Sequence, residues 1–195
     1  GGGEPGGGGT VLNVMDYIAI ASAGNATDFG DLIQTKRGTS GFGSSTRGIF
    51  SGGYAGGYWY NMIEFITIAN TGNGTDFGNL AVPRSAGSGC SNSTRGLLNG
   101  GIFYGNNLSD VMSFVTISSA GNSTDFGNLV AGVKNNMSAA SSTRGLIAGG
   151  TTSGGKSNVI QYVTIASAGN ATDFGDLLGV KEGGAGVSNV HGGLS

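Results

Sequence analysis

The sequence predicts an all-β fold, namely a small β-propeller built from four blades. Three observations predict it: a repeat of 48 or 49 residues that occurs four times, strand-like runs within every repeat, and turn-forming residues between those runs. Glycine supplies 42 of the 195 residues, and hydrophobic residues make up 37%. Because the hydrophobic residues form ordered runs and the glycines are regularly spaced, the composition indicates a folded chain rather than a disordered one.

The repeat is defined by the word Gly-Asn-x-Thr-Asp-Phe-Gly. Its aspartates lie 48, 49 and 48 residues apart, at Asp28, Asp76, Asp125 and Asp173. Asparagine, aspartate and glycine favour turns, because they tolerate left-handed backbone and the two polar side chains bond to their own main chain. We therefore expect a structural turn in each repeat, with the following phenylalanine packed between blades. These residues are Phe29, Phe77, Phe126 and Phe174.

Strand-like runs surround this word. Aromatic and β-branched residues alternate just before it, as in a half-buried strand, at residues 17–21, 65–69, 114–118 and 162–166. A second word, Ser-Thr-Arg-Gly followed by mostly apolar residues and a glycine pair, occurs at 45–53, 93–101 and 142–150. Each repeat then holds about four short strands, which is typical of a propeller blade.

The two ends of the sequence complete the pattern. Residues 188–195 align with residues 44–51, and the glycine pair that should follow is found at Gly1 and Gly2. We therefore expect one domain over 1–195, a ring in which N- and C-terminal strands share one blade so that no sheet edge stays exposed. The predicted units are 188–195 with 1–44, then 45–92, 93–141 and 142–187. Exchange of ends between chains would instead give an eight-bladed dimer or a head-to-tail fibre.

The glycine pairs and the residues around them resemble the kelch repeat. Each pair follows an apolar strand, and residues 80–84 are similar to the stretch that precedes the next blade in kelch proteins. The kelch tryptophan of the third strand is replaced here by the four phenylalanines. The full wording, D-F-G-[DN]-L and S-S-T-R-G, is most similar to the kelch-like tandem repeats of structural and tail proteins of marine phages. This resemblance implies a propeller fold and a place in a virion or outside the cell.

The segment after each glycine pair differs most between repeats, as binding loops on a constant framework do. One of these segments carries three neighbouring aromatic residues, Tyr58, Trp59 and Tyr60. Exposed aromatic side chains stack on sugars and anchor protein contacts, so these residues are the candidate ligand site. The alternative is that one or two of them are buried between blades.

A basic residue recurs near the start of the strand that we expect to be innermost. The four residues are Arg47, Arg95, Arg144 and His191. If they face the channel, they form a cationic ring that binds an anion or a carboxylate. In the alternative, each of them ties down a neighbouring blade through backbone carbonyls or through the turn aspartates.

Composition argues against several other functions. A net charge of −2, with no block of Lys or Arg, does not favour nucleic-acid binding. No apolar stretch approaches the roughly 20 residues that span a bilayer, so membrane insertion is not expected. One histidine and one cysteine supply too few ligands for a zinc or copper site. We expect no metal, no cofactor and no catalytic residues, and hence not an enzyme.

Together, these expectations describe a non-enzymatic structural or adhesive propeller. As a phage tail or fibre component, it would display variable loops to a host-surface glycan or protein, or to another virion protein. Two alternatives are a secreted, carbohydrate-binding lectin-type propeller and a filament-forming subunit joined through its termini. A homo-oligomer is compatible with each of them.

Overall fold

The computed structural model describes residues 1–4 and 10–188. Over these residues the chain forms twenty β-strands and one short 3-10 turn, Tyr104–Asn106, so the predicted all-β class is confirmed. Every strand pairing is antiparallel. Within the described ranges, no helix has the length and apolar character needed to cross a membrane.

Three four-stranded sheets follow one another along the chain, and we number the units that contain them. The second unit holds the sheet β3-β4-β7-β8, with strands Ser40–Gly43, Arg47–Ser51, Met62–Thr67 and Thr75–Asn79. The third unit holds β9-β10-β13-β14, with strands Ser88–Ser91, Arg95–Asn99, Val111–Thr116 and Thr124–Asn128. The fourth unit holds β15-β16-β19-β20, with strands Met137–Ala140, Arg144–Ala148, Val159–Thr164 and Thr172–Asp176. Four strands per repeat are therefore confirmed for these three units.

Each of these units also carries a small hairpin between its second and third sheet strands. The hairpins are β5-β6 (Tyr54–Ala55, Tyr58–Trp59), β11-β12 (Ile102–Phe103, Asn107–Leu108) and β17-β18 (Thr151–Thr152, Gly155–Lys156). The first unit is smaller: its described strands are β1 (Val14–Tyr17) and β2 (Thr27–Asp31). These two correspond in sequence to the third and fourth sheet strands of the other units. Within the described residues, β1 therefore lacks the neighbour that β4 provides for β7.

The Asp-Phe-Gly words lie in the fourth strand of each sheet rather than in turns. Each word holds a β-bulge: in the first unit, Phe29 is an extra residue on its strand opposite the bond between Met15 and Asp16. Gly30 takes a φ of 137°, and its N–H donates to the carboxylate of Asp28 at 3.1 Å. The structure thus differs from the predicted turn, although the aspartate does cap the main chain.

The glycine pairs link the second strand of each sheet to the hairpin. Gly52 and Gly53 have φ angles of 63° and 120°, which residues with a Cβ rarely adopt. The pair with this geometry in the first unit is Gly2 and Gly3, with φ angles of 71° and 144°. The sequence predicted this glycine pair at positions 1 and 2. Its backbone angles place the pair at positions 2 and 3, one residue later.

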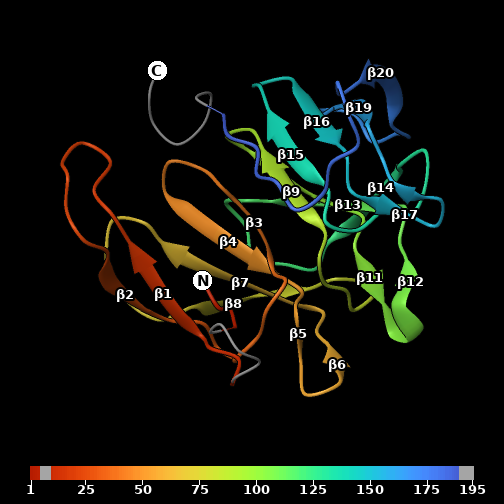
Figure 1. Cartoon of the computed structure of the whole chain (residues 1–195). Helices are drawn as coiled ribbons and strands as arrows, with labels where there is room; N and C mark the ends of the chain where they lie inside the picture. The colour runs from red at the N-terminus through yellow and green to blue at the C-terminus, as the bar shows by residue number, and fades with distance from the viewer. Residues whose placement is uncertain (5–9, 189–195) are drawn as a thin grey trace.

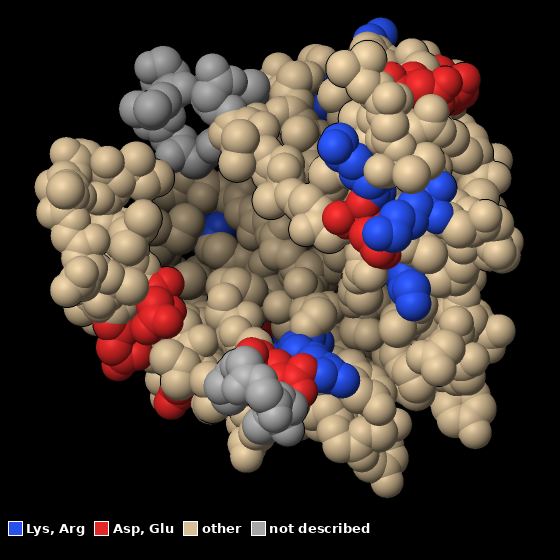
Figure 2. Space-filling model, viewed as in Figure 1, with Lys and Arg blue, Asp and Glu red and all other residues tan. Residues whose placement is uncertain are grey.

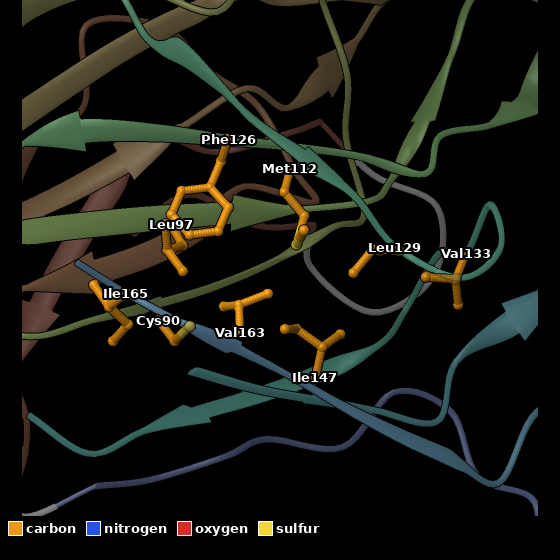
Figure 3. Packing of buried hydrophobic residues seen from close by; sticks show 9 residues of the cluster. All are labelled: Cys90, Leu97, Met112, Phe126, Leu129, Val133, Ile147, Val163 and Ile165. Atoms are coloured by element: carbon orange, nitrogen blue, oxygen red, sulfur yellow. The ribbon is translucent and has the colours of Figure 1, made fainter. Parts of the chain in front are cut away.

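Each pair of neighbouring units among the four is joined by its own hydrophobic cluster. Figure 3 shows the cluster between the third and fourth units: Cys90, Leu97, Met112, Phe126, Leu129, Val133, Ile147, Val163 and Ile165. A second cluster around Phe77 joins the second and third units, and a smaller one around Phe29 joins the first and second. The phenylalanines of the first three words are thus buried between units, whereas Phe174 is 54% exposed.

The first strands of the three sheets meet at the middle of the molecule. β9 contacts both β3 and β15, and Figure 1 shows the three strands gathered there. They line a cavity of about 150 Å³ together with the last described residues of the chain. The lining residues are the triplets 41–43, 89–91, 138–140 and 186–188. Each of the four repeats therefore contributes an equivalent segment to one common centre.

Among residues 1–4 and 10–188, the first and fourth units show no junction like the other three. Figure 1 places β1 and β2 apart from β20, and Figure 2 shows the surface hollowed beside the first unit. Apolar side chains stay uncovered on both sides, with Ile20 97% exposed in the first unit and Phe174 and Leu178 exposed in the fourth. The strand predicted over residues 188–195 cannot be placed here, because residues 189–195 lie outside the described residues.

Candidate functional site

The aromatic residues of the candidate site lie in and beside hairpin β5-β6. Its two-residue turn is Gly56 and Gly57, whose φ angles of 58° and 90° suit a tight hairpin. This turn makes Tyr54 and Trp59 cross-strand partners, and their rings meet edge to face with centroids 4.9 Å apart. The neighbouring side chain of Tyr58 is 72% exposed.

Tyr104 joins this group, although its place in the sequence does not by itself mark it as a site residue. It lies in the 3-10 turn of hairpin β11-β12, is 83% exposed, and its ring centroid is 6.3 Å from that of Trp59. Its position in the sequence could have indicated this contact. Tyr104 follows the glycine pair of the next repeat, and equivalent loops of stacked units come together. Tyr60 behaves differently: it is half-buried, and its main-chain N–H donates to the carbonyl of Gly53 at 2.9 Å.

Two pockets flank Trp59, and we call them together the Trp59 groove. The first has a volume of about 350 Å³, and its lining includes Arg37, Tyr54, Ser85, Ile102 and Asn106. The second has a volume of about 260 Å³ and is lined mainly by Tyr58, Val82, Pro83, Phe103 and Tyr104. The indole nitrogen of Trp59 is shielded from solvent and has no hydrogen-bond acceptor among the described residues. The groove is thus polar on one side of the indole and apolar on the other.

Arg37 stands at the polar end of this groove. Its guanidinium carbon lies 5.5 Å from the centre of the Tyr54 ring, and its Nη1 forms an ion pair with Glu4. The two charged side chains are 45% and 31% exposed. The equivalent hairpin of the fourth unit, β17-β18, offers threonine, glycine and lysine in place of aromatic residues. The aromatic groove therefore belongs to the junction of the second and third units.

The arginines of the second word do not line the central cavity. They begin the second strand of each sheet, whereas the first strands line the cavity, so the innermost position expected for them is not observed. Arg47 stacks on Phe65 at 4.5 Å and donates from Nη1 to the carbonyl of Ile117 in the third unit at 2.9 Å. Arg95 donates in the same way to Ile165 in the fourth unit at 3.1 Å. Each of these arginines ties its unit to the next one.

The other two members of the expected ring lie at the fourth unit and beyond. Arg144 places its guanidinium carbon 4.8 Å from the centre of the Tyr162 ring. His191 lies outside the described residues.

Lys36 and Glu64 form an ion pair between the first and second units, and neither side chain has exposed surface. Glu64 also accepts the main-chain N–H of Ile33 at 2.7 Å. At the next junction Arg84 takes the place of the lysine and donates to the hydroxyl of Ser113 at 2.8 Å. Because these groups are enclosed and satisfied by one another, they link units and offer nothing to a substrate.

The described residues offer little other reactive chemistry. Burial raises the pKa of the Cys90 thiol to about 12, so the thiolate that a nucleophile requires is not formed near neutral pH. In the described part of the chain, no group of three or more His, Cys, Asp and Glu side chains is arranged to hold a metal ion.

Comparison with known proteins assigns no family to this chain. No family model matches it, and no curated protein is similar to it at a significant level. The groove and the repeated junctions therefore have to be interpreted from their own geometry.

Proposed function

We propose that this chain is a non-enzymatic, kelch-like β-propeller that serves as a rigid adhesive module of a phage tail or fibre. In this role its four units form a closed ring, and the Trp59 groove binds a glycan on the host surface. The observation that carries the function is the groove itself, in which rings from two hairpins surround a shielded, unpaired indole N–H. A concave, largely apolar site with a few placed polar groups is typical of ligand binding.

Three features support the ring. Equivalent segments of all four repeats line one cavity. Among the strands that the structure describes, none takes at the edge of β1 the place that β4 takes beside β7. Phe174 is uncovered at the open side, whereas its equivalent Phe126 is buried between units. A strand from the C-terminal end of the chain would pair with β1 and cover the apolar side chains.

The charges at the open side are complementary as well. Lys181 occupies the position of Lys36, since the carbonyl of each accepts the N–H of the second glycine of a pair. Asp16 occupies the position of Glu64, since each lies opposite the aspartate of an Asp-Phe-Gly word in the strand register. Closure of the ring would bring Lys181 to Asp16 as Lys36 is brought to Glu64, and would thereby pair both charges.

Binding to an array of surface glycans tests the adhesive function. Trp59→Ala is expected to weaken glycan binding by at least about tenfold, because truncation of a central aromatic anchor typically costs more than 1 kcal/mol. The matched control is Thr152→Ala, which changes the equivalent hairpin of the fourth unit. Glycan binding that is equal for the two variants would contradict this function.

The open side also favours a second candidate function, a filament-forming subunit joined through its termini. In that arrangement the first unit of one chain would cover the fourth unit of the next, and the same apolar side chains would be buried between copies. Light scattering of the purified chain separates the two functions. A species at 19.2 kDa supports the closed ring, a doubled mass indicates an exchanged dimer, and open-ended polymers indicate the filament.

A secreted, lectin-type propeller would use the same groove without a virion. Lectins with repeated pockets gain avidity from several equivalent sites. The Trp59 groove draws its rings from one pair of hairpins, and the fourth-unit hairpin has none to offer, which favours a single recognition site per chain.

A further inference from the structure

The Trp59 groove continues into a third pocket, so that it consists of three adjoining compartments. The polar compartment, of about 350 Å³, shares Trp59 with the apolar compartment of about 260 Å³. The third compartment, of about 220 Å³, shares Val82 and Phe103 with the apolar one. Compartments in a row with common walls suit a ligand made of linked rings better than a single compact molecule.

The polar compartment presents one cation and further polar side chains that can donate hydrogen bonds. Arg37 contributes a guanidinium, and Ser85 and Asn106 contribute a hydroxyl and an amide. A set of donors that includes a cation favours a ligand group with several acceptor oxygens, above all a carboxylate.

A carboxylate of the chain itself is bound at this point. Glu4 forms an ion pair with Arg37, and both side chains are partly exposed. A carboxylate from a ligand can therefore take the place of Glu4 without disturbing the buried core. The intramolecular pair shows which chemical group this end of the groove accepts.

The far compartment differs in charge from the polar one. Arg84 lines this compartment, but its guanidinium is hydrogen-bonded within the protein. It donates to the carbonyl of Val111 and to the hydroxyl of Ser113, each at 2.8 Å. Asp110 also lines this compartment and would repel a second acidic group. The groove therefore favours an acid at the Arg37 end and neutral groups elsewhere.

We infer that the groove binds an acidic oligosaccharide, with one uronic acid on Arg37 in place of Glu4 and neutral sugars along Trp59 and Tyr104. The inference rests on the proposed adhesive function and names its ligand class. A sugar ring has an apolar face that packs on an aromatic ring, and its hydroxyl groups meet the polar rim. A trisaccharide matches the three compartments.

Titration calorimetry with two probes tests this inference. The probes are a trisaccharide with one uronic acid and the same trisaccharide with its carboxyl group reduced to an alcohol. The acid is expected to bind about tenfold more tightly, which is the size of one added charge-assisted contact. Arg37→Gln is expected to lower the affinity for the acid to that for the reduced sugar. Glu4→Gln is expected to raise the affinity for the acid, because Arg37 is then unpaired.

The outcomes separate this inference from the function on which it rests. Equal affinity of the unmodified chain for the two trisaccharides would overturn the inference and leave the adhesive function standing, as would a preference that survives Arg37→Gln. If Arg37→Gln does not fold, a Glu4→Gln variant with unchanged affinity for the acid would overturn it instead. Binding of tri-glutamate as tightly as the acidic trisaccharide would overturn the assignment to a sugar. Absence of any Trp59-dependent glycan binding would remove the proposed function itself.

Discussion

Three junctions between units are built alike, whereas the described residues of the first and fourth units are not joined in this way. Between the second and third units, the N–H of Gly121 donates to the carbonyl of Phe77 at 2.6 Å, and Asn122 Oδ1 accepts the N–H of Asn79 at 2.9 Å. The same two bonds join the first unit to the second and the third to the fourth. Gly24 begins the same word in the first unit, but it makes no such bond to a described residue of the fourth unit.

This difference shows what the repeated word does. Its Asp-Phe-Gly part forms the bulged fourth strand of its own sheet, while its Gly-Asn part bonds to the fourth strand of the preceding unit. The word is therefore a clamp between units, and it stabilises the fold only where a neighbour is in place. The first unit carries the same clamp residues, and no described residue of the fourth unit bonds to them.

The phenylalanines give the largest expected contrast between a built junction and the open one. Phe126→Ala is expected to lower the free energy of unfolding by about 3–5 kcal/mol, because the buried ring leaves a cavity. Phe174→Ala is the matched change at the open side. If the ring closes as proposed, urea denaturation should show a loss of at least about 2 kcal/mol for it as well. A loss below about 1 kcal/mol would mean that Phe174 stays exposed.

Two glycines of the bulges give the next contrast. A Cβ at Gly78 would lie 2.3 Å from the carbonyl oxygen of Gly121, whereas a Cβ at Gly175 would meet nothing within 4 Å. Both have a positive φ, 147° and 138°, so that an alanine is strained at either site. Gly78→Ala is expected to cost about 3 kcal/mol in thermal denaturation. Ring closure predicts a similar cost for Gly175→Ala, and a cost of about 1–2 kcal/mol, the backbone strain alone, would contradict it.

A charge exchange tests the proposed pairing of Lys181 with Asp16. Asp16→Lys is expected to lower the free energy of unfolding by about 2 kcal/mol, because two like charges would then meet at the junction. Adding Lys181→Asp should recover most of that loss, as measured in a double-mutant cycle. The control is Lys156→Asp, since this lysine pairs with Glu182 elsewhere. Equal recovery from the control would show an effect of net charge rather than of pairing.

The clamp asparagines give the smallest contrast. Asn122→Ala is expected to cost about 1 kcal/mol and to speed amide hydrogen exchange at Asn79, whose N–H loses its acceptor. Asn25→Ala is the matched change in the first unit, and in a closed ring it should speed exchange at Asp176. Exchange at Asp176 that is already fast in the unmodified chain would indicate that the fourth junction does not form.

The sequence predicted the strand before each Asp-Phe-Gly word only approximately. The run at 65–69 covers the last three residues of β7 (Met62–Thr67), and the run at 17–21 meets β1 (Val14–Tyr17) only at Tyr17, because local alternation does not fix where a strand ends. Asp76, Phe77 and Gly78 have the local preferences of a turn but form a bulged strand, because the pairing partner allows one extra residue. The local turn preference of these three residues does not indicate with which strand they pair.

The candidate site was predicted in part for the same reason. Tyr58 and Trp59 stood out because they are neighbours in the sequence and lie in a variable loop. Tyr104, Arg37 and Glu4 did not stand out, because they belong to other loops and reach the groove only through packing of the units. The contacts of Arg47 could not be foreseen either, since its acceptor lies 70 residues away in the chain.

By itself, the sequence determined the four repeats, the all-β class and three of the four places where glycine pairs separate the strands. These are local properties, set by period, by alternation and by backbone angles that only glycine adopts easily. The tertiary structure alone decided which strand of each sheet lies at the centre, which carbonyls the arginines bind and which aromatic rings share a groove. These features depend on how one unit packs against the next, and residues 40–70 positions apart in the chain make the contacts.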